Sequence, residues 1–152
     1  AYQKTDRSWP LVLAGRAGNF GYKQIEELAG TDDLKNDVII LGYISQQNYT
    51  KLLGAASLFA FPSKFEGFGI PVLEAMGVGI PVACSDLSVL REVAGDAAVY
   101  FNPDNVDDIK NKIEKIIKSS DLRKDLINKG HQQCQKFSCE KTARETLDFI
   151  IK

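Results

Sequence analysis

The sequence has no apolar run near the roughly 20 residues that span a bilayer, and its start does not resemble a signal peptide. It also has no excess of charge of one sign, because 19 basic residues stand against 20 acidic ones, for a net charge of -1. Such a balance gives no broad basic surface. We therefore expect no nucleic acid partner.

Metal-ligating and disulfide-forming residues are scarce. The cysteines are odd in number, without the spacing of a zinc site, and His131 is the only histidine. Cys84 lies in an apolar run that predicts a buried thiol, whereas His131 lies in a polar stretch that predicts a solvated helical residue. We expect no metal, and reduced cysteines at Cys84, Cys134 and Cys139 in a cytoplasmic protein.

The 152 residues, 44% hydrophobic and 26% charged, are typical of one globular domain covering residues 1–152. Short runs that are apolar on both faces recur along the chain and alternate with stretches of helical spacing at residues 46–56, 70–77 and 88–94. This pattern predicts an α/β, Rossmann-like, doubly wound parallel sheet. The apolar runs are Leu11–Gly15, Val38–Gly42, Leu58–Pro62, Pro81–Ser85 and Ala97–Phe101.

Extra helices are predicted after the fifth apolar run. Asn105 is expected to cap a helix through Lys118, Ser120 or Asp121 to cap one that runs towards Phe137, and Ser138 to begin a last helix. At the other end, residues 1–10 have the pattern of the tail of a helix whose beginning lies upstream.

The most informative segment runs from Phe61 to Glu74, from the end of an apolar run into a helix. Ligands of open α/β sheets bind beyond the carboxyl ends of the strands. Gly67 and Gly69 are expected to adopt φ values closed to other residues and to let a ligand approach the backbone. Pro71 suits the first helical turn, whose free N–H groups and dipole favour a diphosphate.

Two carboxylates, Glu66 and Glu74, stand in this segment with seven residues between them. Glu74 lies about one turn into the helix, and a carboxylate accepts well from two vicinal hydroxyls such as those of a ribose. Glu66 in the loop is placed to meet a second polyol. Either glutamate alone is better explained as a surface residue near a helix start, but the complete string favours a ligand site.

This string resembles the Glu-x7-Glu motif of the group 1 retaining glycosyltransferases, a family that includes sucrose synthase, glycogen synthase and many bacterial mannosyl- and glucosyltransferases. The resemblance implies the donor-binding C-terminal half of a GT-B fold, in an enzyme of polysaccharide biosynthesis that transfers a hexose with retention. It extends from about Leu11 to Asp108 and is carried by Leu41–Ile44, Phe59–Ser63, Glu66–Ala75, Gly79–Val82, Arg91–Val93 and Gly95–Ala98.

The resemblance also implies roles for individual residues. Glu66 would contact the transferred sugar as the catalytic residue, and Glu74 would bind the ribose of a nucleoside-diphosphate sugar. Arg16, in the loop after the first run, is open to two interpretations, a diphosphate ligand or a solvent-facing residue. The implied donor-binding residues are Arg16, Tyr43 and Ile44 near the base and diphosphate, and Gly67, Phe68, Gly69, Ile70 and Glu74.

The sequence departs from the family pattern in two respects. Residues 1–10 hold no clear counterpart of the family's phosphate-binding Arg and Lys, and the N-terminal acceptor domain is missing. We therefore expect a truncated donor domain that binds weakly and turns over little alone. The implied partners are the donor and that N-terminal half. Contact with a membrane would be possible only through that half. No cofactor or metal is expected, because Asp32–Asp33 and Asp107–Asp108 are better explained as helix caps.

Two other functions remain open. The glycines at Gly15, Gly18 and Gly21 follow the first run, as in a dinucleotide-binding domain, but their spacing is not Gly-x-Gly-x-x-Gly and no acidic residue follows Gly42. The second alternative is a non-catalytic module that binds a nucleotide sugar.

Overall fold

The computed structural model describes residues 1–5, 9–16, 18 and 21–151. The chain divides into two compact units, Ala1–Leu52 and Leu53–Lys152, each considered by itself below. The prediction of a single domain over residues 1–152 stays a prediction. None of the helices in the described ranges is long and apolar enough to cross a membrane.

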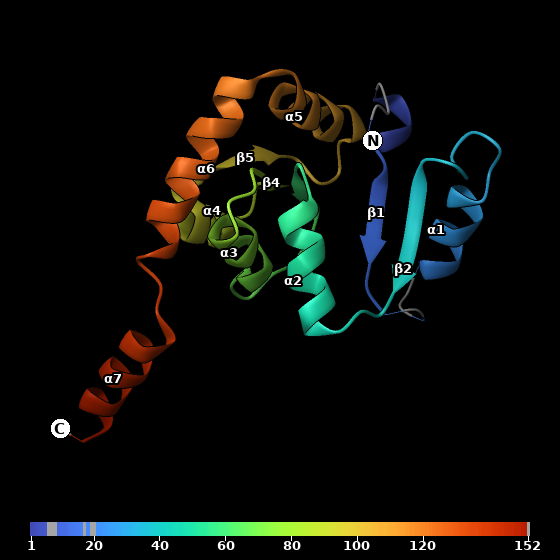
Figure 1. Ribbon diagram of the computed structural model, residues 1–152. Coiled ribbons are helices and arrows are strands. Elements are labelled where there is room, and N and C mark those ends of the chain that lie inside the picture. Colours follow the sequence, from blue (N-terminus) through green and yellow to red (C-terminus); the bar gives the residue numbers. More distant parts are fainter. Residues whose placement is uncertain (6–8, 17, 19–20, 152) are drawn as a thin grey trace. The chain divides into compact units, whose positions relative to one another are not determined.

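The first unit is a parallel β-α-β arrangement. Strand β1 (Leu11–Ala14) pairs in parallel with β2 (Val38–Gly42), and α1 (Tyr22–Ala29) connects them and lies beside β2 (Figure 1). Sequence reasoning missed α1, although Tyr22, Ile25 and Leu28 repeat at helical spacing. Before β1, a short 3-10 helix, η1 (Tyr2–Lys4), precedes residues 6–8, which lie outside the described residues.

The second unit contains a three-stranded parallel sheet in the order β3-β4-β5. Its strands are β3 (Phe59–Phe61), β4 (Val82–Ser85) and β5 (Ala98–Phe101). All residues of central β4 are buried, as its run of apolar residues predicts for a covered parallel strand. Helix α2 (Gln46–Ala55), which ends in this unit, contributes buried Leu53.

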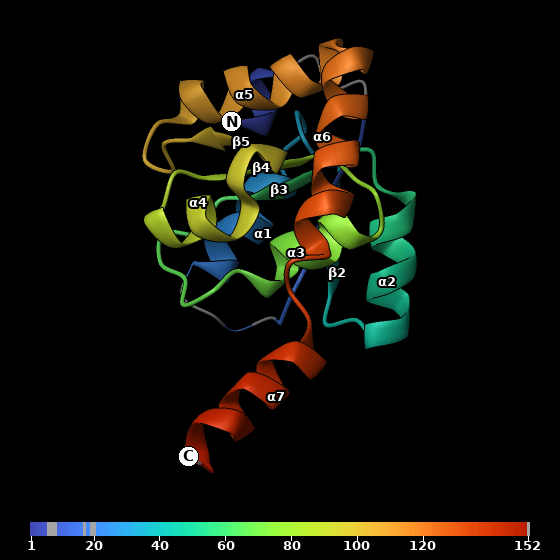
Figure 2. The same cartoon turned by 90° about the vertical axis from the view of Figure 1, so that its left-hand side faces the viewer.

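Helices α3 (Ile70–Gly77) and α4 (Ser88–Ala94) connect the strands of this sheet, with a 3-10 turn, η2 (Gly95–Ala97), before β5. Helices α5 (Val106–Lys118) and α6 (Ser120–Cys134) follow, and Ile116 and Leu126 from them pack against Ala83 and Phe101 of the sheet. Figure 2 shows α5 along β5 and α6 beside α3.

The expectation of one five-stranded sheet is wrong, because the strands form two parallel sheets. In a doubly wound sheet of the order 3-2-1-4-5-6, the first strand hydrogen-bonds to both flanks. Strands β1 and β2 pair as strands 2 and 3 of that order do, and β3, β4 and β5 pair as strands 4, 5 and 6 do. No segment in the described parts of the chain pairs as the first strand of that order does, so the five strands hydrogen-bond as two separate sheets. The α/β class with parallel strands is confirmed.

The helix starts were predicted closely. Asn105 caps α5 by accepting from the backbone N–H groups of Asp107 and Asp108, as expected. Ser138 caps α7 (Cys139–Ile150) by accepting from the N–H of Lys141. The cap of α6 is Ser119 rather than Ser120 or Asp121, since its side chain is the one that accepts from Leu122.

The expectation that Asp32 and Asp33 cap a helix is wrong, because residues 32–37 form turns. Asp32 instead forms an ion pair with Lys35, with 2.7 Å between Nζ and Oδ1, and Asp33 accepts a hydrogen bond from Gln3. The expectation that Asp107 and Asp108 are caps is also wrong, because Asn105 is the cap of α5. They lie in the first turn of α5, one and two residues beyond its first residue, where negative charge suits the helix dipole.

Candidate functional site

Residues 62–69 form a loop that connects β3 to α3. Strand β3 ends at Phe61, and α3 begins at Ile70 directly after Gly69. The motif therefore lies at the carboxyl end of a parallel strand, the edge at which open α/β sheets bind ligands. This confirms the predicted loop and helix start.

The two glycines of the loop have different roles. Gly69 caps α3 in the left-handed region, with φ 99° and ψ 39°. A Cβ added there would lie 2.5 Å from Cδ2 of Leu90, which is fully buried, so a larger residue does not fit without strain. The expectation of a special φ at Gly67 is wrong, because Gly67 is not among the positive-φ glycines. Nothing lies within 4 Å of its added Cβ, so open space lets a ligand approach Gly67.

The start of α3 leaves backbone donors unused. Pro71 has no N–H, and the N–H of Val72 donates to the carbonyl of Gly69 over 3.0 Å. Within the described ranges, no residue accepts a hydrogen bond from the N–H of Gly67 or Phe68. These donors and the positive end of the helix dipole favour an anion at this place.

Both carboxylates of the motif are half-buried, Glu66 in the loop and Glu74 in α3. No residue in the described part of the chain forms a hydrogen bond or an ion pair with either of them. Glu114 in α5 behaves differently, since it pairs with Lys118 over 2.6 Å. A carboxylate without a protein partner keeps all its acceptor positions for hydroxyl groups.

Two polar contacts hold the first half of the loop, and sequence reasoning missed both. The hydroxyl of Ser63 donates to the carbonyl of Phe65 over 2.9 Å. Lys64 forms an ion pair with Asp104, in the turn between β5 and α5. Because both side chains are 70% exposed, this pair contributes at most about 1 kcal/mol. Lys64, the basic residue of this loop, is therefore already paired with a carboxylate.

In the first unit, Arg16 and Tyr43 lie together beyond the carboxyl ends of β1 and β2. The Cζ atom of Arg16 lies 5.4 Å from the centroid of the Tyr43 ring. The loop N–H of Gly15 donates to the carbonyl of Gly42 over 2.9 Å, which joins the two segments. Tyr43 is 70% exposed and Ile44 is half-buried. The predicted donor residues thus form two groups, one in each unit.

The glycine-containing loop before α1 has features of both sequence interpretations. It connects β1 to α1, with Gly18 at φ 96° and Gly21 at φ 88°, as a dinucleotide-binding loop would. Residues 17, 19 and 20 of this loop lie outside the described residues. The residues after β2 are Tyr43 and Ile44, neither of which offers the carboxylate that such a domain uses on a ribose.

Comparison with known families decides between these interpretations. The family model described as glycosyl transferases group 1 matches residues 1–133. The chain belongs to this family. One curated relative of this group 1 glycosyltransferase chain is the O-antigen chain mannosyltransferase B of Escherichia coli. The two are 34% identical over 152 residues, which cover 97% of the chain and 40% of the relative. The chain thus spans less than half of that protein.

Solved structures confirm the fold of this group 1 glycosyltransferase. Anabaena Alr3699/HepE in complex with UDP-glucose is 21% identical, with a TM-score of 0.87 over 97% of the chain and 42% of that protein. The C-terminal domain of the group 1 family protein LpcC of Francisella tularensis is 23% identical, with a TM-score of 0.76 over 89% of the chain and 72% of that domain. The fold is that of the C-terminal half of a GT-B enzyme, whereas the roles of individual residues stay predictions.

Sequence reasoning also missed a charged network after β4 in this glycosyltransferase. Nη2 of Arg91 donates to Asp86 over 2.8 Å, and its guanidinium lies over the Tyr100 ring, 4.5 Å from the centroid. The hydrogen bond from Arg91 holds the pKa of Asp86 below its usual range. Burial, then the charge of Asp86, raises the pKa of the Cys84 thiol to about 12. Cys84 is therefore protonated at neutral pH and is a buried structural residue, as predicted.

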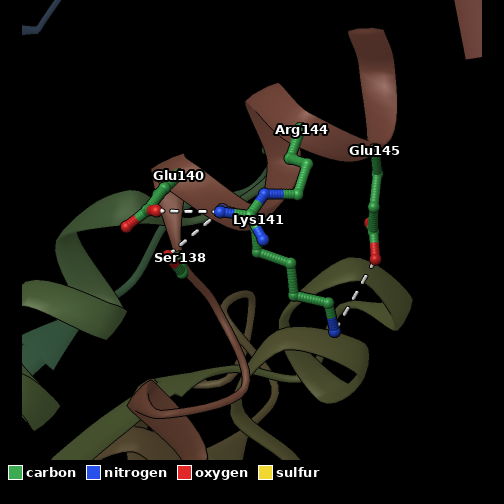
Figure 3. Close-up of a pocket in the computed structure, with 5 residues that line it drawn as sticks. All are labelled: Ser138, Glu140, Lys141, Arg144 and Glu145. Atoms are coloured by element: carbon green, nitrogen blue, oxygen red, sulfur yellow. Dashed lines mark hydrogen bonds and ion pairs between the residues drawn. The ribbon is translucent and has the colours of Figure 1, made fainter. Parts of the chain in front are cut away.

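A shallow pocket at the start of α7 is lined by charged residues that bind one another (Figure 3). Arg144 pairs with Glu140 over 3.3 Å, and Lys141 with Glu145 over 3.8 Å. The exposed charges that line this pocket thus have partners within α7. In the described ranges, no three His, Cys, Asp or Glu side chains gather as metal ligands would.

The geometry of the two glycines predicts that substitution by alanine lowers stability strongly at Gly69 and hardly at all at Gly67. Gly69→Ala should lower the free energy of unfolding by about 2–5 kcal/mol, because it adds left-handed strain and a collision with Leu90. Gly67→Ala should change it by less than about 0.5 kcal/mol, because its Cβ meets open space. Urea unfolding of both variants measures the difference, and equal losses would contradict the assignment.

Proposed function

We propose that this chain is the donor-binding domain of a retaining glycosyltransferase that transfers a hexose from a nucleoside-diphosphate sugar. The observation that supports this most is the segment from Glu66 to Glu74, in which backbone donors and two carboxylates have no partner among the residues that the structure describes. A diphosphate requires donors, whereas the hydroxyls of a ribose and a hexose require acceptors. Both requirements are met on one short segment.

In this proposal each part of the motif has one task. Glu74 accepts hydrogen bonds from the ribose hydroxyls, and Glu66 contacts the transferred sugar. The N–H groups from Gly67 to Ile70 face the diphosphate. They stabilise the charge that the leaving diphosphate gains in the transition state, since preformed donors act without reorganisation. The transfer is metal-independent, because these donors and the helix dipole take the place of a cation.

Considered by itself, the first unit offers groups that suit a nucleobase and a phosphate. Tyr43 offers an exposed aromatic surface, and Ile44 an apolar edge, for the nucleobase. Arg16 offers a positive charge that suits a phosphate group, and its stacking on Tyr43 limits the conformations of a long side chain.

The curated relatives suggest which sugar to test first. Several are mannosyltransferases, two of them of O-antigen chains, which supports a mannose nucleotide as donor and a role in the assembly of a surface polysaccharide. The alternative is a non-catalytic nucleotide-sugar-binding module. Transfer by the complete parent protein separates the two, since a module binds the donor but releases no nucleoside diphosphate.

A calorimetric panel of mannose and glucose nucleotides with guanosine, uridine and adenosine tests the proposal on this chain. Glu74→Gln should weaken binding of the preferred nucleotide by about 1–3 kcal/mol, the range for hydrogen bonds to a charged group. The melting temperature should barely change. Failure of every nucleotide sugar to bind would reject the proposed function.

Glu92→Gln is the matched control for this experiment. Glu92 occupies the fifth position of α4, as Glu74 does in α3, and both substitutions remove one charge near a helix start. If Glu74→Gln behaves like Glu92→Gln and only lowers the melting temperature, Glu74 serves the helix rather than a ribose.

Glu66 should affect turnover more than it affects binding of the nucleotide. In the complete parent enzyme, Glu66→Ala should lower kcat by far more than it raises the Kd of the free nucleoside diphosphate, because that ligand lacks the transferred sugar. Steady-state kinetics and calorimetry on the same protein measure the two effects. Losses of equal size would contradict the assigned partner of Glu66.

The chain by itself should not transfer sugar. Orientation of the acceptor against the donor contributes about 7–11 kcal/mol to such a reaction, and we assign that task to a partner domain outside these 152 residues. We expect donor affinity in the millimolar range, about -4 kcal/mol, with at most slow hydrolysis. Release of radiolabelled free sugar measures hydrolysis, and incorporation of the label into an acceptor measures transfer. Robust transfer to an acceptor would show that the donor-domain proposal is wrong.

A further inference from the structure

The second half of the loop 62–69 is held by an aromatic contact. The rings of Phe68 and Phe137 lie edge to face, with 5.7 Å between centroids and 84° between planes. Such pairs stabilise beyond the area that they bury. Phe68 stands between Gly67 and Gly69, which have no side chains, so its ring is the side chain that holds this stretch of backbone, beside the packing of Gly69 on Leu90.

Phe137 is itself fixed relative to α3. It lies between α6 and α7, and its N–H donates to the carbonyl of Cys134 over 3.1 Å. The thiol of Cys134 donates to the carbonyl of Leu73 in α3 over 3.2 Å. A Cβ added to Gly130 would lie 3.2 Å from Cβ of Met76, so α6 packs closely on α3 (Figure 2). The end of α6 therefore presents Phe137 at a defined place beside the loop.

This contact links the two halves of the proposed donor site. Glu74 lies on α3, whereas Glu66 and the donors of Gly67 and Phe68 lie on the loop. A loop with two glycines loses much conformational entropy when it is ordered, and donors stabilise charge best when they are ordered beforehand. The contact of Phe68 with Phe137 fixes the position of the loop relative to α3, and in this way orders the donors in the free protein.

We propose that Phe137 is a positioning residue that orders the Gly67–Gly69 backbone through the ring of Phe68. Phe137 contacts no ligand in this scheme. Its effect on donor affinity rests on the proposed function, whereas its effect on the order of the loop does not. The two effects are therefore measured separately.

Phe137→Leu removes the ring, Phe137→Tyr retains it, and Phe149→Leu makes the same change on a ring of α7 that is 83% exposed. In 15N relaxation of the 152-residue chain, Phe137→Leu should lower the order parameters of the Gly67 and Gly69 amides towards the flexible range, below about 0.6. The amides of β4 should keep their values. Phe137→Tyr and Phe149→Leu should match the wild-type chain.

Calorimetry with the nucleotide sugar selected by the panel gives the second readout. Phe137→Leu should raise the Kd about two- to tenfold, the effect of losing one aromatic pair. Phe68→Leu should raise it similarly, and the double variant should add little, because both substitutions remove the same contact. Phe137→Tyr should restore wild-type affinity.

The outcomes separate the two proposals. Unchanged order at Gly67 and Gly69 in Phe137→Leu, or an equal loss of order in β4, would overturn the positioning role and leave the proposed function standing. Loss of order confined to the loop, in a chain that binds no nucleotide sugar, would uphold the positioning role and reject the proposed function. Additive effects of the Phe68 and Phe137 substitutions would also overturn the inference.

Discussion

The close approach of Gly69 to Leu90 sets the geometry on which the rest of the site depends. With only a hydrogen facing that buried side chain, the backbone turns through φ 99° and α3 begins at the next residue. Leu90 lies on α4, so the loop after β3 is packed against the helix that follows β4. Val72 and Met76 are buried, which fixes the rotation of α3 about its axis and places Glu74.

Charged side chains around the motif fall into two kinds. Lys64 with Asp104, and Asp86 with Arg91, are engaged in ion pairs that hold loops. Glu66 and Glu74 have no partner in the described ranges, although both are half-buried. A carboxylate without a partner keeps its acceptor positions open for the hydroxyls of a sugar nucleotide. This contrast supports ligand binding by Glu66 and Glu74 over a role at a helix terminus.

The sequence by itself determined the features that depend on neighbouring residues. Runs that are apolar on both faces identified the strands, since a covered parallel strand has no polar face. The caps Asn105 and Ser138 were predicted because a cap uses a side chain and N–H groups two or three residues later. The string from Glu66 to Glu74, together with the other segments between Leu11 and Asp108 that resemble the family, predicted the family.

Only the tertiary structure decided the features that join distant segments. The division into two parallel sheets depends on which strands find hydrogen-bonding partners, and no local pattern encodes that. Gly67 and Gly69 look alike in sequence, but only Gly69 faces a buried leucine, on α4. The contact of Phe68 with Phe137 requires that α6 pack on α3. Residue type and spacing specify local backbone geometry, whereas contacts across the fold are specified by packing of the whole core.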